Sequence, residues 1–226
     1  MDLAGFTDWH SHILPAVDDG VQSTDEALAI LESCGRMGVK AVWLTPHIME
    51  DIPNTTAGLT GRFNELKAAY TGSVELHLAA EYMLDNLFET RLAAGDLLTL
   101  GETGCHLLVE TSYFNPPMNL FDMLEEIKRK GYYPVLAHPE RYIYMHEDDY
   151  VRLKGMGVKF QVNLFSLFGA YGLHAAKKSE WLLKKGFNDM FGSDTHRIDD
   201  YRDGVAKRVG RDVLKMITDS NKITNI

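Results

Sequence analysis

Only two cysteines, Cys34 and Cys105, occur in this 226-residue chain. Two thiols are too few for a disulfide scaffold, and they fit a protein that works in a reducing compartment. Neither cysteine begins the C-x5-R motif of cysteine-dependent phosphatases, because Lys40 and Thr111 stand where the arginine would be. We therefore predict that both cysteines pack in the core and that neither is a nucleophile.

Long apolar stretches and clusters of positive charge are also missing. No segment approaches the roughly 18 apolar residues of a membrane-spanning helix, and the first residues lack the apolar core of a signal peptide. The formal net charge is −9, and no run of Lys and Arg offers a surface for phosphate backbones or anionic lipids. We expect a cytoplasmic protein that neither binds nucleic acid nor inserts into a membrane.

Short apolar runs alternate with amphipathic runs along the whole chain. The apolar runs predict strands at 4–9, 40–45, 74–79, 105–111, 132–137, 158–163 and 188–193. The amphipathic runs predict helices at 24–37, 59–70, 119–131, 174–186 and 200–218. Ser23 and Glu26 form a capping-box pattern before the first helix.

This alternation is typical of an α/β fold in which parallel strands are covered by helices. No G-x-G-x-x-G or G-x-x-x-x-G-K-[ST] motif follows a strand, which favours a barrel over a nucleotide-binding open sheet. No linker, repeat or low-complexity segment divides the chain, so residues 1–226 are expected to form one domain. The segment 48–58 has the Pro, Asn and Gly content of a loop.

Metal-binding side chains follow six of the seven predicted strands. Functional sites of parallel α/β folds form where the strands end, so these side chains are expected to converge. They are His10, His12, Asp19, His47, Glu81, Glu110, His138, Asp194 and His196. So many ionisable groups need compensating charge when they are buried together. Histidine and carboxylate are the usual ligands of divalent cations, and we predict a metal centre.

The spacing and charge of these residues indicate how the centre is built. His10 and His12 are two residues apart, so on an extended backbone they point to the same side; Asp194 and His196 repeat the arrangement. The four carboxylates carry −4 together, and three divalent ions would leave +2 before Arg141 adds its charge. A positive pocket of this kind suits a phosphate ester better than a neutral amide.

The motifs DWHSH, TPH, AAE, VET, AHPER and GSDTH, in this order, resemble the PHP superfamily of metal-dependent phosphoesterases. Within it, HSHILPAVDDG, LTPH, LLVETS and LAHPERY resemble the bacterial CpsB/CapC-type protein tyrosine phosphatases of capsule and exopolysaccharide loci. The resemblance implies a distorted (β/α)7 barrel with outer helices and three divalent ions, commonly Mn²⁺; such ligand sets also accept Fe, Zn or Co. The implied reaction is hydrolysis of phosphotyrosine on a protein, namely the tail of a bacterial tyrosine kinase that controls polysaccharide synthesis.

The resemblance also implies three ligand groups: His10, His12, Glu81 and Asp194; Glu81, Glu110 and His138; and Asp19, His47 and His196. Asp18 is expected in a turn or behind the ligands, and His47 is a candidate to assist the leaving tyrosyl oxygen.

Arg141 of HPER matches the family's phosphate-binding arginine. A second arginine usually follows the last histidine, and both Arg197 and Arg202 are candidates. Arg202 is favoured because DDYRDG opens a predicted helix whose N-terminus can help to hold an anion.

Three alternatives remain open from the sequence. The nearest is a PHP-family phosphatase of a small phosphate monoester such as histidinol phosphate. An amidohydrolase-type enzyme shares the HxH motif, but Glu110 stands where that class usually has a lysine. A non-catalytic metal-binding module would be expected to have lost ligands, and none is lost. The sequence does not specify the oligomeric state.

Overall fold

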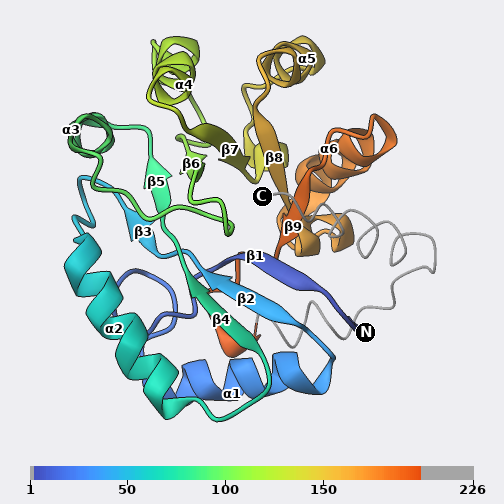
Figure 1. Cartoon of the computed structure of the whole chain (residues 1–226). Helices are drawn as coiled ribbons and strands as arrows, with labels where there is room; N and C mark the ends of the chain where they lie inside the picture. The colour runs from blue at the N-terminus through green and yellow to red at the C-terminus, as the bar shows by residue number, and fades with distance from the viewer. Residues whose placement is uncertain (1–2, 200–226) are drawn as a thin grey trace.

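Parallel strands form a curled sheet with α-helices packed on its outer side (Figure 1). The structure is a computed structural model and describes residues 3–199. The predicted helix 200–218 and the candidate Arg202 lie outside the described residues. Among the helices of this part of the chain, none is long and apolar enough to cross a membrane.

All seven strands predicted from the sequence are present, with ends that differ from the prediction by at most three residues. They are β1 (Thr7–Ser11), β2 (Ala41–Leu44), β4 (Glu75–Leu78), β6 (His106–Glu110), β7 (Tyr133–Ala137), β8 (Lys159–Asn163) and β9 (Met190–Gly192). Two short strands were not predicted: β3 (His47–Ile48) and β5 (Glu81–Met83). They follow β2 and β4 after breaks at residues 45–46 and 79–80, so each continues the strand before it.

The strands pair in parallel in the orders β1-β2-β4 and β3-β5-β6-β7-β8-β9. The curled sheet closes between its first and last strands. A parallel bridge joins Ser11 to Thr195, and the Asp194 amide donates to the His10 carbonyl at 2.8 Å. The buried carboxylate of Asp8 also accepts from the Ser193 amide at 2.7 Å. The predicted barrel of parallel strands is therefore confirmed.

Helices connect the strands and cover the outside of the sheet (Figure 1). They are α1 (Thr24–Arg36), α2 (Thr56–Ala69), α3 (Asn86–Ala94), α4 (Leu120–Arg129), α5 (Glu147–Gly155) and α6 (Gly172–Lys184), with short 3-10 helices η1 (Pro139–Arg141) and η2 (Leu164–Phe168). The prediction missed α3 and α5. Each has nine residues, and α5 buries only Tyr150 and Leu153, so the apolar spacing that identifies a helix is too brief to recognise.

Three local predictions need correction. Ser23 caps α1 by accepting from the Glu26 amide. In a capping box the Glu26 carboxylate would accept from the Ser23 amide in return, but here it accepts from the Ile198 amide at 3.1 Å. The predicted loop 48–58 is shorter, because Ile48 belongs to β3 and α2 begins at Thr56. Cys34 is buried in the core as predicted, whereas Cys105 is only partly buried.

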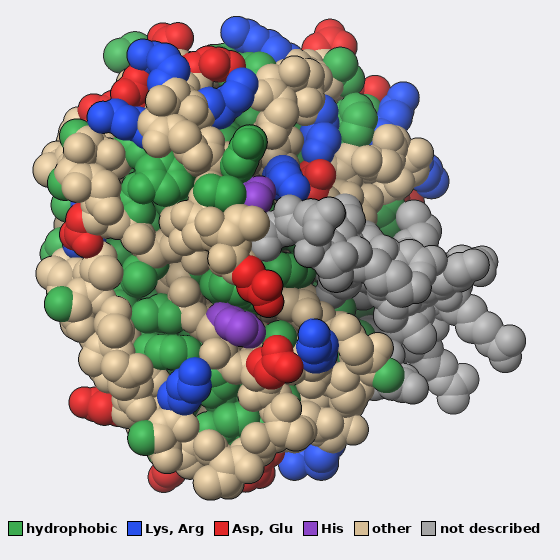
Figure 2. All heavy atoms as spheres, viewed as in Figure 1, with side chains coloured by type: hydrophobic (Ala, Val, Ile, Leu, Met, Phe, Trp, Pro, Cys, Tyr) green, Lys and Arg blue, Asp and Glu red, His purple; other side chains and the backbone are tan. Residues whose placement is uncertain are grey.

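Apolar side chains pack on both faces of the sheet, where they form two separate clusters. In β6, Leu107, Leu108 and Val109 alternate between its faces and are all fully buried, as expected for a parallel strand covered on both sides. On the face shown in Figure 2, basic and acidic side chains are interspersed among the described residues, without a broad region of one sign.

Candidate metal centre

The proposed ligands lie at the ends of the strands, where the curled sheet brings them together. His10 lies in β1, with His12 directly after it, and Glu110 ends β6. The breaks after β2 and β4 position two further ligands. His47 is the first residue of β3 and Glu81 is the first residue of β5, and the two are paired in register. His138, Asp194 and His196 follow β7 and β9. The structure thus brings together all nine residues predicted from the sequence.

The innermost group joins both ends of the chain. His10 Nε2 lies 3.0 Å from His12 Nε2, 3.2 Å from Glu81 Oε2 and 3.6 Å from Asp194 Oδ1. His12 Nε2 lies 3.3 Å from the same glutamate oxygen and 3.5 Å from the same aspartate oxygen. A tetrahedral ion with bonds of about 2.1 Å needs ligand atoms about 3.4 Å apart. These five separations are therefore close to those between atoms that share a metal ion.

A second group surrounds the other side of Glu81. His138 Nε2 is 2.9 Å from Glu81 Oε1 and 3.8 Å from Glu110 Oε2. His47 Nδ1 is 3.1 Å from Glu81 Oε2 and 3.1 Å from Glu110 Oε1. The sequence prediction groups Glu81 and Glu110 with His138, whereas the metal-capable group of the described residues that contains both carboxylates is completed by His47. In both arrangements Glu81 is shared between neighbouring groups.

The third group is the one most open to solvent. The Asp19 side chain is 66% exposed, and its Oδ1 lies 3.6 Å from His47 Nε2 and 3.5 Å from His196 Nε2. His12 belongs to this group as well. The two ring nitrogens of His47 therefore face two different groups, which makes the whole centre a single continuous cluster.

Four buried atoms of the proposed ligands have no hydrogen-bond partner among residues 3–199: His138 Nδ1 and a set of three, namely His47 Nδ1, Glu81 Oε2 and Glu110 Oε1. Each unsatisfied buried polar atom costs about 1–3 kcal/mol, and these three lie against one another. A divalent cation would satisfy all of them at once. The donor set therefore fits a metal centre.

The charges of the metal-free cluster support the same conclusion. Burial lowers the pKa of His10, but Glu81 and Asp194 outweigh that effect and raise this pKa to about 9. Burial raises the pKa of Glu81, yet the surrounding histidines bring it well below its usual range. Without metal, a proton on His10 thus supplies part of the positive charge that the buried carboxylates need.

Amide and carboxylate groups behind the ligands fix the orientation of the first two histidines. Gln161 Oε1 accepts from His10 Nδ1 at 2.7 Å, and Asp18 Oδ2 accepts from His12 Nδ1 at 2.8 Å. Each contact leaves Nε2 free to bind an ion, which is the usual role of such partners. The prediction that Asp18 lies behind the ligands is confirmed.

Sequence reasoning missed the contribution of β8. Gln161 donates to Asn163 Oδ1 at 3.0 Å, and Asn163 Nδ2 donates to Asp194 Oδ2 at 2.6 Å. The two amides link His10 to Asp194 across the interior, although β8 supplies no ligand. Their signal is visible in the sequence: polar residues at alternate positions of a buried strand point to the same side.

Arg141 lies at the edge of the cluster. Its Nη1 donates to Asp194 Oδ2 at 2.7 Å, and its Cζ lies 4.2 Å and 4.3 Å from the ring centroids of Tyr113 and Tyr171. The aromatic pair was not identified from the sequence. Arg197 is exposed and touches none of these groups in the contacts that the structure describes.

The backbone is strained at two of the proposed ligands. His138 has φ 32° and Asp194 has φ 53°, and only one other non-glycine residue of the described chain has a positive φ. Such conformations cost about 1–3 kcal/mol each and cluster at functional sites. Here they turn the chain sharply after β7 and β9, so that each side chain faces inward.

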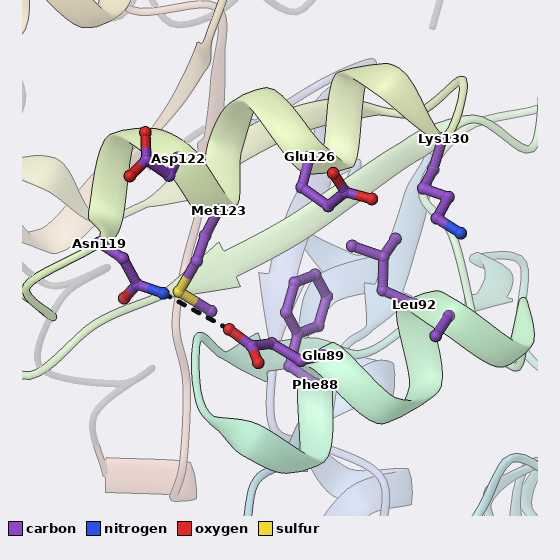
Figure 3. Close-up of a pocket in the computed structure, with 9 residues that line it drawn as sticks. Phe88, Glu89, Leu92, Asn119, Asp122, Met123, Glu126 and Lys130 are labelled. Carbon is purple, nitrogen blue, oxygen red and sulfur yellow. Dashed lines mark hydrogen bonds between the residues drawn. The ribbon is translucent and has the colours of Figure 1, made fainter.

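A separate hollow of 330 Å³ lies between α3 and α4, away from this cluster. Figure 3 shows Phe88, Leu92 and Met123 lining it, with the Asn119 amide donating to Glu89 across its rim. Histidine is absent from its lining, and none of the metal-capable groups of the described chain includes a residue of this hollow.

Comparison with known proteins identifies the family. The family model for capsular polysaccharide synthesis, CpsB/CapC, matches residues 6–225. The chain belongs to the CpsB/CapC family. The tyrosine-protein phosphatase YwqE of Bacillus subtilis is 28% identical over 197 residues, which cover 84% of this chain and 77% of YwqE.

Two further comparisons agree with this membership. The tyrosine-protein phosphatase CpsB of Streptococcus pneumoniae is 28% identical over 205 residues, covering 85% of this chain and 83% of that protein. A solved structure of these metal-dependent tyrosine phosphatases, YwqE of Bacillus subtilis and CpsB of Streptococcus pneumoniae, superposes on this chain. The TM-score is 0.81 and the sequence identity is 24%. The superposition covers 96% of this chain and 93% of that chain, so the CpsB/CapC member described here shares their fold.

Proposed function

We propose that this CpsB/CapC family member is a metal-dependent phosphatase that hydrolyses phosphotyrosine on protein. The observation that carries the proposal is the position of Glu81, whose two oxygens face His10, His12, His47 and His138 within 3.3 Å. One carboxylate shared in this way is suited to hold two neighbouring ions. Family membership and the similarity to the tyrosine-protein phosphatases YwqE and CpsB support tyrosine phosphatase activity.

The proposed ligands are the nine residues predicted from the sequence, and the proposed ions are three divalent cations, with Mn²⁺ first among them. The ions, when bound, would supply the charge that activates water and neutralises the phosphoryl oxygens. Gln161 and Asp18 would hold the imidazoles in the ligating tautomer. The carboxylates of Glu81 and Asp194 would remain ionised, since neighbouring histidines depress the pKa of both.

Arg141 is the proposed phosphate-binding residue. It uses Nη1 for Asp194, and a planar guanidinium has further N–H donors that can bind a phosphoryl oxygen. Arg202 remains our proposal for the second arginine. Both ring nitrogens of His47 face carboxylates, which suits a metal ligand, and His47 also remains our candidate to assist the leaving tyrosyl oxygen. A tyrosyl oxygen, with a pKa of about 10, leaves without strong acid assistance.

The proposed substrate is the phosphorylated tail of a tyrosine kinase in a capsule or exopolysaccharide pathway, met in the cytoplasm. The membership in a capsular polysaccharide synthesis family supports this setting. Protein phosphotyrosine is also preferred over a small ester such as histidinol phosphate, because both relatives described above are tyrosine-protein phosphatases.

The test is hydrolysis of p-nitrophenyl phosphate by purified protein after chelation and after addition of Mn²⁺. We expect activity only with metal, and turnover of a phosphotyrosine peptide well above that of histidinol phosphate. Glu81→Gln should abolish both metal retention and activity, whereas the exposed Glu180→Gln should change neither. Full activity after complete chelation would refute the proposal.

A further inference from the structure

A pocket of 220 Å³ opens beside Arg141 at the edge of the metal centre. It is lined by Tyr113, Arg141, Ile143, Tyr171, His174 and Ala175. Apart from Arg141 and His174, this lining is aromatic or aliphatic.

The pocket adjoins the ligand cluster directly. The Tyr113 ring lies tilted against the His138 ring, with 5.5 Å between the ring centroids, and the Tyr171 hydroxyl lies 3.3 Å from Asp194 Oδ2. Arg141 lines the pocket and also contacts the same aspartate oxygen. A molecule whose anionic end meets Arg141 therefore has its remaining atoms against these apolar walls.

Three loops from different strands build the pocket. Tyr113 follows β6, Ile143 follows η1, and Tyr171 precedes α6. The first two loops are joined by a hydrogen bond from the Ile143 amide to the Tyr113 carbonyl at 3.0 Å. The walls are thus fixed relative to the cluster, and they do not depend on a single isolated loop.

The size and chemistry of the pocket match one aromatic ring. A closed apolar cavity of about 150 Å³ can hold benzene, so 220 Å³ leaves room for a substituted ring. The Ile143 side chain is 52% exposed although it is apolar, and covering it would remove apolar surface from water. Such a gain favours a ring over a short alkyl group.

We propose that this pocket binds the aromatic ring of the phosphate ester, so that Tyr113, Ile143, Tyr171 and Ala175 determine specificity for aryl over alkyl phosphates. The inference rests on the proposed phosphatase activity and adds the residues that recognise the leaving group. Phosphoserine and phosphothreonine would reach Arg141 but leave the pocket unfilled. Arg141 would hold the phosphoryl end while its stacking between Tyr113 and Tyr171 keeps it in place.

Direct binding of two non-hydrolysable probes tests the pocket. Phenylphosphonate and methylphosphonate carry the same anionic group and differ in the ring. We expect calorimetric titration of the Mn²⁺-loaded protein to show phenylphosphonate binding at least about tenfold more tightly, from the apolar area that the ring buries. Equal affinities for the two probes would overturn the inference.

Variants at Ile143 locate the effect. Ile143→Glu places a charge in the wall, and we expect the affinity ratio of the two probes to fall to within about twofold of one. Val151→Glu is the matched control, because Val151 is 53% exposed on α5 and lies outside the pocket; its ratio should equal that of the unaltered protein. A ratio preserved in Ile143→Glu would also overturn the inference.

Two safeguards keep these outcomes distinct. If Ile143→Glu binds neither probe, Ile143→Ser decides, because it removes the apolar wall without adding charge and should also reduce the ratio. Turnover of p-nitrophenyl phosphate with Mn²⁺ by the unaltered protein reports the proposed function separately. If the enzyme is active but binds the two probes equally well, the proposal of a ring-binding pocket is refuted and the proposed phosphatase activity stands.

Discussion

The side-chain oxygen of Gln161 accepts a hydrogen bond from Nδ1 of His10 at 2.7 Å. This contact sets the tautomer of the imidazole, because an acceptor at Nδ1 places the ring proton there and leaves Nε2 with a free lone pair. A strand without a single proposed ligand thus controls the first ligand of the chain.

Replacing this glutamine should weaken the metal centre. Gln161→Met keeps a side chain of similar size but removes both the acceptor for His10 and the donor for Asn163. Loss of such a partner typically costs 10- to 100-fold in metal affinity, and we expect a Mn²⁺ titration to show a reduction of about that size.

A destabilised control separates this effect from loss of folding. Leu153→Ala removes fully buried side-chain atoms from α5, away from the cluster. It should lower the unfolding temperature without changing Mn²⁺ affinity. An unchanged affinity in Gln161→Met would show that Gln161 does not orient His10.

Arg141→Lys should reduce catalysis while retaining the metal. Lysine keeps the positive charge beside Asp194 but cannot stack as a planar group between Tyr113 and Tyr171 or bind phosphate with a forked donor. Loss of one positioned donor costs about 100- to 1000-fold in kcat elsewhere, and we expect a decrease approaching that range for p-nitrophenyl phosphate. Metal content, measured by elemental analysis, should not change.

The exposed Arg129 offers the matched control. Its side chain is 67% exposed and pairs with Glu126 on the surface of α4. Arg129→Lys should preserve kcat within experimental error. If Arg141→Lys behaved in the same way, Arg141 would have no part in binding the phosphoryl group.

Metal binding should release protons near neutral pH. In the metal-free protein, the carboxylates of Glu81 and Asp194 raise the pKa of His10 to about 9. At pH 7.5 this imidazole is therefore protonated, and it must lose its proton to bind an ion. We expect Mn²⁺ affinity to rise with pH up to about 9. In calorimetry, the binding enthalpy should vary with the ionisation enthalpy of the buffer, and a buffer-independent enthalpy would contradict this.

The same titration should affect stability in the metal-free state. A histidine whose pKa is raised on folding contributes stability that is complete below its unfolded value, about 6.5, and is lost as pH rises through about 9. The unfolding temperature of chelated protein should therefore fall across this interval. Metal-loaded protein should not show this decrease, because the ion has already displaced the proton.

Core packing under α4 should account for a large part of the folding stability. Leu124 is fully buried on this helix, so Leu124→Ala should lower the free energy of unfolding in urea by about 2–5 kcal/mol. The neighbouring Glu125 has a side chain that is 47% exposed. Glu125→Ala should stay within about 0.5 kcal/mol of the unaltered protein, and equal losses would mean that α4 does not pack as described.

Much of the fold and most of the centre could be predicted, because both depend on regular spacing. Strand–helix alternation predicts parallel strands, and the rule that sites form at strand ends collects ligands as distant as His10 and Asp194. The short strands β3 and β5 could not be recognised, because two or three residues show no periodicity. They arise from breaks that place His47 beside Glu81.

Contacts between separate loops could not be predicted. The stacking of Arg141 between Tyr113 and Tyr171 joins segments that follow β6 and β7 and precede α6. No local pattern encodes that meeting, which depends on how the sheet curls. The contact of the Glu26 carboxylate with the Ile198 amide could not be predicted for the same reason, because Ile198 lies 172 positions further along the chain.

The seam between β1 and β9 has a consequence for biosynthesis. His10 leaves the ribosome early, but the Asp194 side chain that completes its group and the Ser193 amide that anchors Asp8 are made much later. A nascent or prematurely terminated polypeptide ending before β9 would carry the histidine pair with neither the last carboxylate nor the closing strand. We therefore expect the complete metal centre, and with it catalytic activity, only in chains that extend past Asp194.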